Sequence, residues 1–221
     1  MFNPIHIGQS DMLYPSALRF SLADRAPAIV TARGNLDILR GQSVEHRSPT
    51  IALFCSIQCS GNLILQTYDL ACALRDAGAT VISGFHSPME KECLLLLLRG
   101  TQPVIICPAR GIDNMRLPAD WKVALTRGRL LLLSPFAEKL HRVTTRCAQQ
   151  RNEFVAALAD VLFVAFAAPG SKTERFCCDV LAWGKPLLTL DSEENAGLLA
   201  LGARAVGPEG ICRDPVFAQR S

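Results

Sequence analysis

The amino-acid sequence predicts an α/β fold with a doubly wound, mostly parallel sheet and helices on both of its faces. From Pro49 onward, short apolar or β-branched runs alternate with longer helix-like segments, which is the order of βαβ units. Most of the apolar runs are continuous, as strands covered on both faces require. Glycines stand at or just beyond the expected helix ends, where a left-handed cap suits them. Right-handed crossovers then distribute the helices over the two faces.

Each element follows from this alternation. The expected strands are 51–55, 80–83, 104–107, 130–134, 161–165, 187–190 and 203–206. The expected helices are 62–76, 89–99, 121–126, 144–159, 174–183 and 194–201. The glycines at or after helix ends are Gly78, Gly100, Gly128, Gly184 and Gly202.

The first part of the chain has a different pattern. Residues 1–47 contain short apolar pieces interrupted by Tyr14-Pro15, by Ala26-Pro27 and by Arg33-Gly34-Asn35. Such pieces form small helices or an edge strand. We therefore expect a short N-terminal arm, 1–47, that packs on one main domain, 48–221. A length of 221 residues suits one sizeable core better than two complete domains.

Composition excludes several classes of protein. With 49% hydrophobic and 19% charged residues, the chain has the balance of a packed globule. Its longest apolar runs are far short of the roughly 20 residues that span a bilayer, and its N-terminus lacks the order of a secretory signal. A cytoplasmic protein without a membrane partner is expected. The nine cysteines include no CxxC pair, which favours reduced core thiols, with no metal site and no cofactor. The net charge of +3 does not decide the function.

In a sheet of this kind, ligands bind beyond the carboxyl ends of the strands, so the loops there are the candidate site. The first such loop, 56–62, is rich in small and polar residues. Its amides and hydroxyls, together with the start of the next helix, suit a phosphate group. The alternative is an ordinary turn that Ser60 or Asn62 caps. The ligand-binding candidates in this loop are Ser56, Gln58, Ser60 and Gly61.

The second loop, 83–90, begins at the end of a strand and leads into a helix. Ser87 and Glu90 have the spacing of a capping box, which is a structural explanation for both. No such explanation covers His86, which stands close to Ser83 and Gly84 and is well placed to touch a ligand. Ser83, Gly84 and His86 are therefore ligand-binding candidates.

The third loop, 168–174, places a glycine, two hydroxyl residues and a lysine directly before a helix. Amides there point outward from the positive end of the helix, and a lysine adds charge. The spacing is not that of a Walker loop. N-capping by Ser171 or Thr173 is the alternative explanation. The candidates are Gly170, Ser171, Lys172 and Thr173.

Two further donors complete the candidate site. Arg151 and Asn152 precede the 161–165 strand, and Arg110 follows the 104–107 strand. Arginine suits bidentate recognition of a phosphate, although a solvated helix face is the more common use of such residues. We expect the loops at Ser56, Ser83 and Gly170 to converge on one cleft near Arg151. We also expect the Lys172 and Arg151 side chains to end at the surface.

Several short motifs occur in the order that is typical of one family. They are Tyr14-Pro15-Ser16-Ala17-Leu18, Arg33-Gly34-Asn35-Leu36, Ser83-Gly84, Arg151-Asn152, Gly170-Ser171 with Thr173, and Leu201-Gly202-Ala203. In this order they resemble the DprA/Smf family of DNA-processing proteins, whose Rossmann-like core is related to the nucleotide-handling LOG proteins. The resemblance implies a Rossmann-like fold and binding of single-stranded DNA.

The sequence also departs from the pattern of that family. Cys55-Ser56-Ile57 stands where the family has a G-[ST]-R loop, and the segment from Phe85 to Glu92 replaces a G-I-D-x-x-A-H segment. Glu153 takes the place of the second arginine of an R-N-R triplet. We expect neither a winged-helix tail nor a helical N-terminal domain beside the core. We therefore expect a minimal, divergent member.

Two functional hypotheses follow. In the first, the chain is a non-catalytic DprA-like binding protein for single-stranded DNA or another phosphate-bearing ligand, which hands DNA to a recombinase in DNA processing or recombination; a homodimer is a further hypothesis. In the second, it is a LOG-like enzyme or sensor of a small nucleotide. Hydrolysis of an N-glycosidic bond would then use His86, Glu90 or Glu174 as acid or base.

Overall fold

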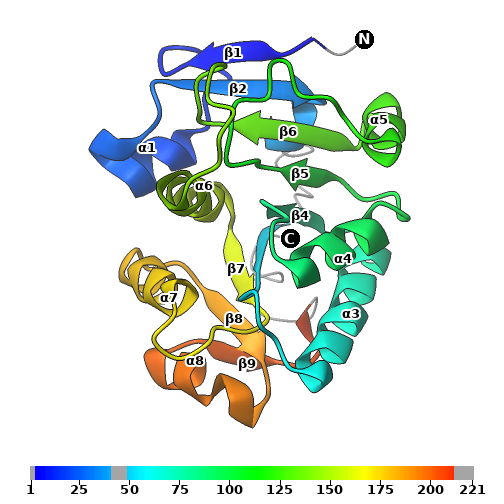
Figure 1. Cartoon of the computed structure of the whole chain (residues 1–221), viewed down its shortest axis with the longest axis vertical. Coiled ribbons are helices and arrows are strands. Elements are labelled where there is room, and N and C mark those ends of the chain that lie inside the picture. The colour runs from blue at the N-terminus through cyan, green and yellow to red at the C-terminus, as the bar shows by residue number, and fades with distance from the viewer. Residues whose placement is uncertain (1–2, 41–48, 212–221) are drawn as a thin grey trace.

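The chain folds around one nine-stranded sheet with the strand order β1-β2-β6-β5-β4-β3-β7-β8-β9. The computed structural model describes residues 3–40 and 49–211. Figure 1 shows the strands in this order from the top of the view to the bottom. Their bounds are β1 Ile5–Gly8, β2 Ile29–Gly34, β3 Thr50–Phe54, β4 Thr80–Ser83, β5 Val104–Ile106, β6 Leu130–Ser134, β7 Val161–Val164, β8 Leu187–Leu190 and β9 Arg204–Val206.

The seven strands from β3 to β9 are parallel, which confirms the predicted sheet. In the middle, Ile51 of β3 is opposite Val81 of β4 on one side and Val161 of β7 on the other. The chain proceeds from β3 through β4 and β5 to β6, then returns to β7 on the other side of β3. The order therefore reverses between β3 and β7. A doubly wound sheet binds ligands at such a switch point.

The N-terminal segment joins the same sheet. β1 pairs with β2, and β2 pairs with β6, both in antiparallel orientation. Gly34, at the end of β2, has a φ of +125°, and a Cβ at this position would lie 2.3 Å from the carbonyl oxygen of Leu130. The glycine of the Arg33-Gly34-Asn35 motif thus allows β2 to approach β6 closely.

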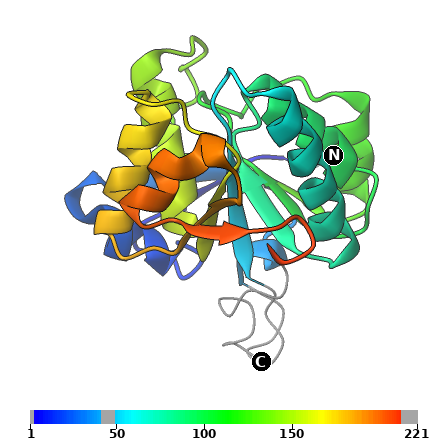
Figure 2. The same ribbon diagram turned by 90° about the horizontal axis from the view of Figure 1, so that it is seen from below.

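Helices cover both faces of the sheet, as Figure 2 shows from below. α3 (Gly61–Asp76), α4 (Pro88–Leu97) and α5 (Ala119–Thr126) share one apolar cluster with the sheet. α1 (Ser16–Leu22), α6 (Thr145–Leu158), α7 (Lys172–Ala182) and α8 (Ala196–Leu201) contribute to the other. The short α2 (Asp37–Arg40) and the 3₁₀ turns η1 (Ala23–Arg25) and η2 (Glu193–Asn195) complete the described elements. The helix predicted at 194–201 therefore begins as a 3₁₀ turn.

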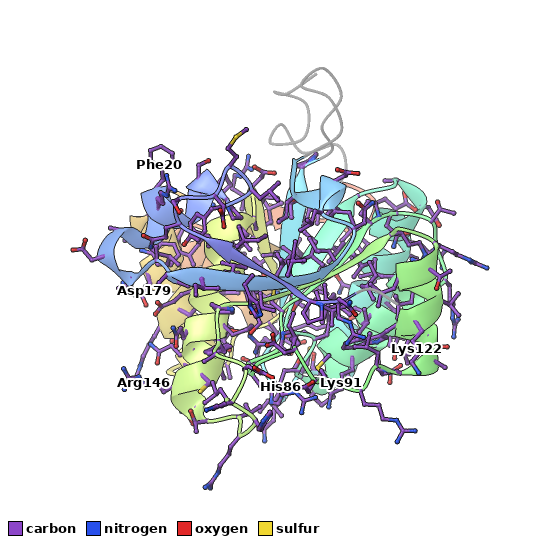
Figure 3. The ribbon with its side chains drawn as sticks, turned by 90° about the horizontal axis from the view of Figure 1, so that it is seen from above. Phe20, His86, Lys91, Lys122, Arg146 and Asp179 are labelled. Atoms are coloured by element: carbon purple, nitrogen blue, oxygen red, sulfur yellow. The ribbon has the colours of Figure 1, made fainter. Side chains whose placement is uncertain are left out.

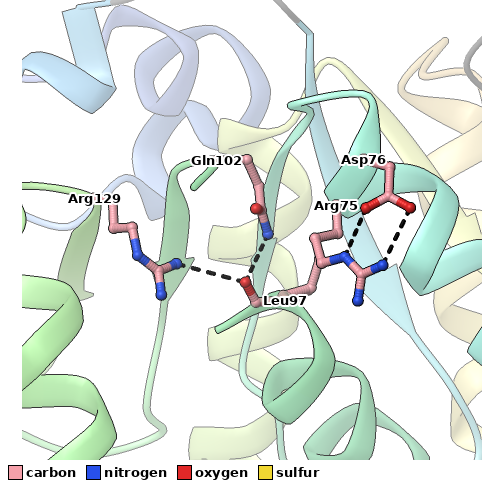
Figure 4. Close-up of polar contacts among 5 residues, drawn as sticks. All are labelled: Arg75, Asp76, Leu97, Gln102 and Arg129. Atoms are coloured by element: carbon pink, nitrogen blue, oxygen red, sulfur yellow. Dashed lines mark hydrogen bonds and ion pairs between the residues drawn. The ribbon is translucent and has the colours of Figure 1, made fainter. Parts of the chain in front are cut away.

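Side chains from neighbouring elements satisfy the C-terminal end of α4 (Figure 4). Gln102 Nε2 donates to the carbonyl oxygen of Leu97 at 2.8 Å. The buried guanidinium of Arg129 donates to the carbonyl oxygens of Leu97 and Leu98. Carbonyl groups at the C-terminal end of a helix lack hydrogen-bond donors within the helix, and the side chains of Gln102 and Arg129 supply these donors. The network lies at the amino-terminal edge of the sheet, away from the loops considered below.

The described cysteines are free thiols, and most of them are buried. Cys55, Cys93, Cys107, Cys147 and Cys177 are buried, whereas Cys178 is exposed. Cys212 lies outside the described residues. Within residues 3–40 and 49–211, no helix combines the length and apolar character needed to cross a membrane. The same residues contain no cluster of three or more His, Cys, Asp and Glu side chains suited to a metal ion.

Candidate functional site

Hydrogen bonds join the loops on either side of the switch point. Ser56, in the loop from β3 to α3, donates its N–H to the carbonyl oxygen of Phe166 at 2.9 Å, and its hydroxyl accepts from Ala168 N–H at 3.2 Å. The Ser60 hydroxyl of the same loop donates to Glu194 Oε1, in η2, at 2.7 Å. The loops after β3, β7 and β8 therefore lie together at the carboxyl edge of the sheet.

The carboxylate of Glu90 links β3 to the loop after β4. One oxygen accepts from Cys55 N–H at 3.1 Å, and the other accepts from His86 N–H at 2.8 Å. Ser87 and Glu90 form the capping box that the sequence predicted. Glu90 is buried, and both of its oxygens bond to backbone amides. These contacts favour the structural interpretation of Glu90 over a role as an acid or base.

Ser83 and Gly84 have structural contacts as well. Ser83 is buried, its hydroxyl donates to the carbonyl oxygen of Leu53 at 2.7 Å, and it accepts from Phe85 N–H. A Cβ on Gly84 would lie 1.1 Å from Nη1 of Arg151. The guanidinium thus occupies the space beside the glycine.

The expectation that the Arg151 side chain ends at the surface is wrong. Arg151 is 5% exposed, with Nη1 3.5 Å from the carbonyl oxygen of Cys107 and Nε donating to Asn152 Oδ1 at 2.8 Å. Burial lowers the pKa of Arg151, and the nearby Glu90 opposes that effect. Position 151 falls on the inward face of α6, next to Phe154 and Val155. Its guanidinium therefore supports the packing of α6 against the loops after β4 and β5.

The loop from β7 to α7 carries its own anion. Gly170 has a φ of +70°, and its N–H donates to Glu174 Oε2 at 2.7 Å. Ser171 caps α7 by accepting from Glu174 N–H at 3.1 Å, which agrees with the alternative interpretation of this loop. The carboxylate of Glu174 thus accepts a hydrogen bond from one of the backbone amides that were expected to bind a phosphate. Lys172 is exposed, as expected, and Thr173 is half-buried.

The other candidates differ in exposure. Gln58, Gly61 and His86 are exposed, whereas Ser60, Arg110 and Asn152 are half-buried. Ser60 caps α3, as the alternative interpretation of its loop proposed. The shared hydrogen bonds place the loops at Ser56 and Gly170 together, and Glu90 connects the loop after β4 to them.

The sequence analysis missed a group of cations in the loop from β6 to α6. Lys139, His141 and Arg142 are exposed there, Arg146 is exposed in the first turn of α6, and Lys91 is exposed in the first turn of α4. Figure 3 shows His86, Lys91 and Arg146 along one edge of the molecule, opposite Phe20. The available signal was the concentration of basic residues within 139–146, between the expected strand 130–134 and the body of the next helix. We define the exposed Lys91, Lys139, Arg142, Arg146 and Lys172 as the cationic edge.

A cavity of about 450 Å³ lies between the N-terminal segment and α6, next to this edge. Arg146, Gln149 and Arg25 are among its lining residues. Arg25 Nη1 donates to Glu153 Oε2 at 2.6 Å. The glutamate that departs from the R-N-R triplet therefore neutralises an arginine of the N-terminal segment.

The sheet order, the switch point and the loops define a Rossmann-like α/β protein. The model of the DNA recombination-mediator protein A family matches residues 6–176, and the chain belongs to this family. A comparison with curated protein sequences gives no match.

Solved structures agree on the fold. DNA processing protein A of Streptococcus pneumoniae is 20% identical, with a TM-score of 0.77 over 95% of this chain and 73% of that chain. The protein of the same name from Helicobacter pylori, described for its mode of binding single-stranded DNA, is 18% identical, with a TM-score of 0.71 over 92% and 91% of the two chains. A molybdenum cofactor binding protein of Rippkaea orientalis is 14% identical, with a TM-score of 0.56 over 79% and 99%.

Proposed function

We propose that this chain binds single-stranded DNA through its phosphate backbone, without catalysis, in DNA processing or recombination. The observation that carries the proposal is the cationic edge, whose exposed lysines and arginines lie beyond the carboxyl ends of the parallel strands. Cations in this position suit DNA because phosphate contacts supply most of the sequence-independent affinity. They position the strand without reading its bases.

Family membership supports the same function. The family is described as that of DNA recombination-mediator protein A, and the Helicobacter pylori relative binds single-stranded DNA. We infer from the family that the chain hands its DNA to a recombinase. The homodimer stays a prediction, which a measurement of the mass in solution tests.

The site uses exposed groups rather than all of the residues predicted from the sequence. Gln58, Gly61, His86 and Lys172 are accessible to a strand of DNA at this edge. Ser83 and Arg151 support the loops from within the protein. A DNA strand would contact the exposed residues directly. Ser83 and Arg151 would affect binding only through the conformation of the loops that they support.

The nucleotide-directed alternative has less support. An acid or base for an N-glycosidic bond needs a carboxylate that is free to exchange a proton with the substrate. The Glu90 and Glu174 carboxylates both accept hydrogen bonds from backbone amides instead. His86 is exposed and is the remaining candidate of that set.

Binding of a fluorescent oligothymidylate and of thymidine monophosphate, each over a range of salt concentrations, tests the proposal. We expect the oligomer to bind with an affinity that falls steeply with salt, by a logarithmic slope of roughly 0.7 for each phosphate contact. The monophosphate should compete poorly. Tight binding of the monophosphate with a shallow slope, together with release of its base, would favour the alternative. An oligomer that does not bind at all would rule the proposal out.

A further inference from the structure

The cavity between the N-terminal segment and α6 is formed by segments that meet at the carboxyl edge of the sheet. Thr31 of β2 is opposite Ser134 of β6, so the chain that enters β2 lies beside the chain that leaves β6. α1 packs against α6, as Figure 1 shows. The cavity has a volume of about 450 Å³. This volume falls within the range of about 300 to 1,000 Å³ that is typical of small-molecule sites.

Apolar side chains form part of the cavity wall. Leu22, at the end of α1, and Phe154, on α6, are buried there. Pro27 and Pro135 are half-buried and come from the segments that enter β2 and leave β6. These four side chains offer an apolar surface to the flat face of a ring. Small-molecule sites combine such a surface with a few convergent polar groups.

An ion pair holds the guanidinium of Arg25 at the cavity. Nη1 of Arg25 donates to Oε2 of Glu153 at 2.6 Å. The Glu153 side chain is 17% exposed, whereas that of Arg25 is 58% exposed. A guanidinium is planar, and nucleobases stack on its face. The ion pair restricts the orientation of this plane and offsets its charge, so the site suits a neutral ring better than a free anion.

Three exposed residues of α6 connect the cavity with the cationic edge. Gln149 and Gln150 line the cavity, and their amides can both donate and accept hydrogen bonds, as the edge of a nucleobase does. Arg146 lines the same cavity and belongs to the cationic edge. A phosphate bound by Arg146 would therefore hold the base of its own nucleotide beside the cavity.

We propose that this cavity binds one unstacked nucleobase of a single-stranded DNA whose phosphates contact the cationic edge. The inference rests on the proposed function and adds a second kind of contact to it. Stacking accepts any sequence, because every base has a flat face. It differs from a phosphate contact in releasing no counterions, so the base adds affinity without adding to the salt slope.

Two oligomers of equal length separate the base contact from the phosphate contacts. One is oligothymidylate, and the other is an abasic oligomer with the same number of phosphates. We expect the full chain to bind oligothymidylate about fivefold or more tightly, with the same logarithmic salt slope for both. We call the ratio of these two affinities the base ratio. Competition against a fluorescent oligothymidylate measures it.

Variants of the cavity should lower the base ratio and leave the salt slope and the urea midpoint unchanged. Gln149→Trp places a large side chain at the cavity from an exposed position on α6, and Val123→Trp, at an exposed position on α5, is its matched control. Arg25→Lys keeps the positive charge beside Glu153 and removes the planar face. Lys172→Ala, outside the cavity, should have the reverse effect, with a shallower slope and an unchanged base ratio.

The outcomes distinguish this inference from the proposed function. Equal affinity of the wild type for the two oligomers would overturn the inference, and steep salt dependence of both would still support the proposed function. A base ratio that stays the same in Gln149→Trp and Arg25→Lys, or that Val123→Trp lowers equally, would also overturn it. If neither oligomer binds, the proposed function fails and the inference fails with it.

Discussion

Arg151 and Gly84 occupy one space: the guanidinium of Arg151 lies where a side chain on residue 84 would have to be, 1.1 Å from the position of its Cβ. The two residues are 67 positions apart and come from α6 and from the loop after β4. Nη1 of Arg151 also approaches the carbonyl oxygen of Cys107. The contact between Ser83-Gly84 and Arg151-Asn152 therefore joins two of the motifs that identify the family.

Gly84→Ala should destabilise the fold, because the new methyl group forces the buried guanidinium out of its place. We expect a loss of about 2 to 3 kcal/mol in the free energy of unfolding, measured with urea. Gly61→Ala is the matched control, since its Cβ would meet nothing within 4 Å. In an Arg151→Ala background the same Gly84→Ala change should cost less, because the obstacle has gone. Equal costs in both backgrounds would contradict this contact.

Lys172→Ala and Arg142→Ala should each weaken binding of oligothymidylate and leave the urea midpoint unchanged. Both side chains belong to the cationic edge and are exposed. We expect each change to cost about 1 to 3 kcal/mol of binding and to reduce the logarithmic salt slope by roughly 0.7. Lys122→Ala is the control, because Lys122 is exposed on α5, outside the cationic edge, and Figure 3 shows it on the opposite side of the view from Arg146. Unaltered affinity in both edge variants would place the DNA elsewhere.

Glu174→Gln should strengthen binding of oligothymidylate. The carboxylate accepts from Gly170 N–H at the start of α7, where a positive helix end favours a phosphate. Removal of its charge makes this site more favourable to an anion. Affinity measured at low salt should rise about threefold or more, the scale of a charge at a helix end. A loss of nucleotide turnover in this variant would instead support the enzymatic alternative.

Buried thiols should make the fold less stable in alkaline solution. Burial, followed by the charges of Cys178 and Glu174, raises the pKa of Cys177 to about 12. The pKa of a cysteine in an unfolded chain is about 8.5. Between these values the unfolded chain loses a proton that the folded chain keeps, so stability falls as pH rises above about 8.5.

Cys177→Ala should remove that contribution. The free energy of unfolding of this variant should fall less steeply between pH 7.5 and pH 9.5, with a difference of about 1.4 kcal/mol at pH 9.5 relative to neutral pH. Urea unfolding under a reducing agent measures it, and Cys178→Ala, at an exposed position, is the control. Parallel pH profiles for wild type and Cys177→Ala would contradict a buried, protonated thiol.

The sequence by itself determined the parallel sheet, because continuous apolar runs between capped helices report local preferences and burial on both faces. The predicted strands at 51–55 and 130–134 agree closely with β3 and β6. The capping box of Ser87 and Glu90 could also be predicted from the sequence, because its hydrogen bonds are local and join residues at a fixed spacing. The order of short motifs was sufficient to indicate the family.

Only the tertiary structure decided which candidate side chains are exposed and which are buried. Arg151 points inward because it lies on the face of α6 that packs on the sheet, together with Phe154. The short sequence Arg151-Asn152-Glu153 does not by itself reveal which face of the helix is buried. The strand β2 joins the sheet by pairing with β6, a contact about 100 residues distant in the chain, and β1 joins it by pairing with β2. Glu174 reaches back to Gly170, and Ser56 contacts Ala168, through loop conformations that depend on neighbouring loops. Such contacts depend on register and packing, which periodicity does not encode.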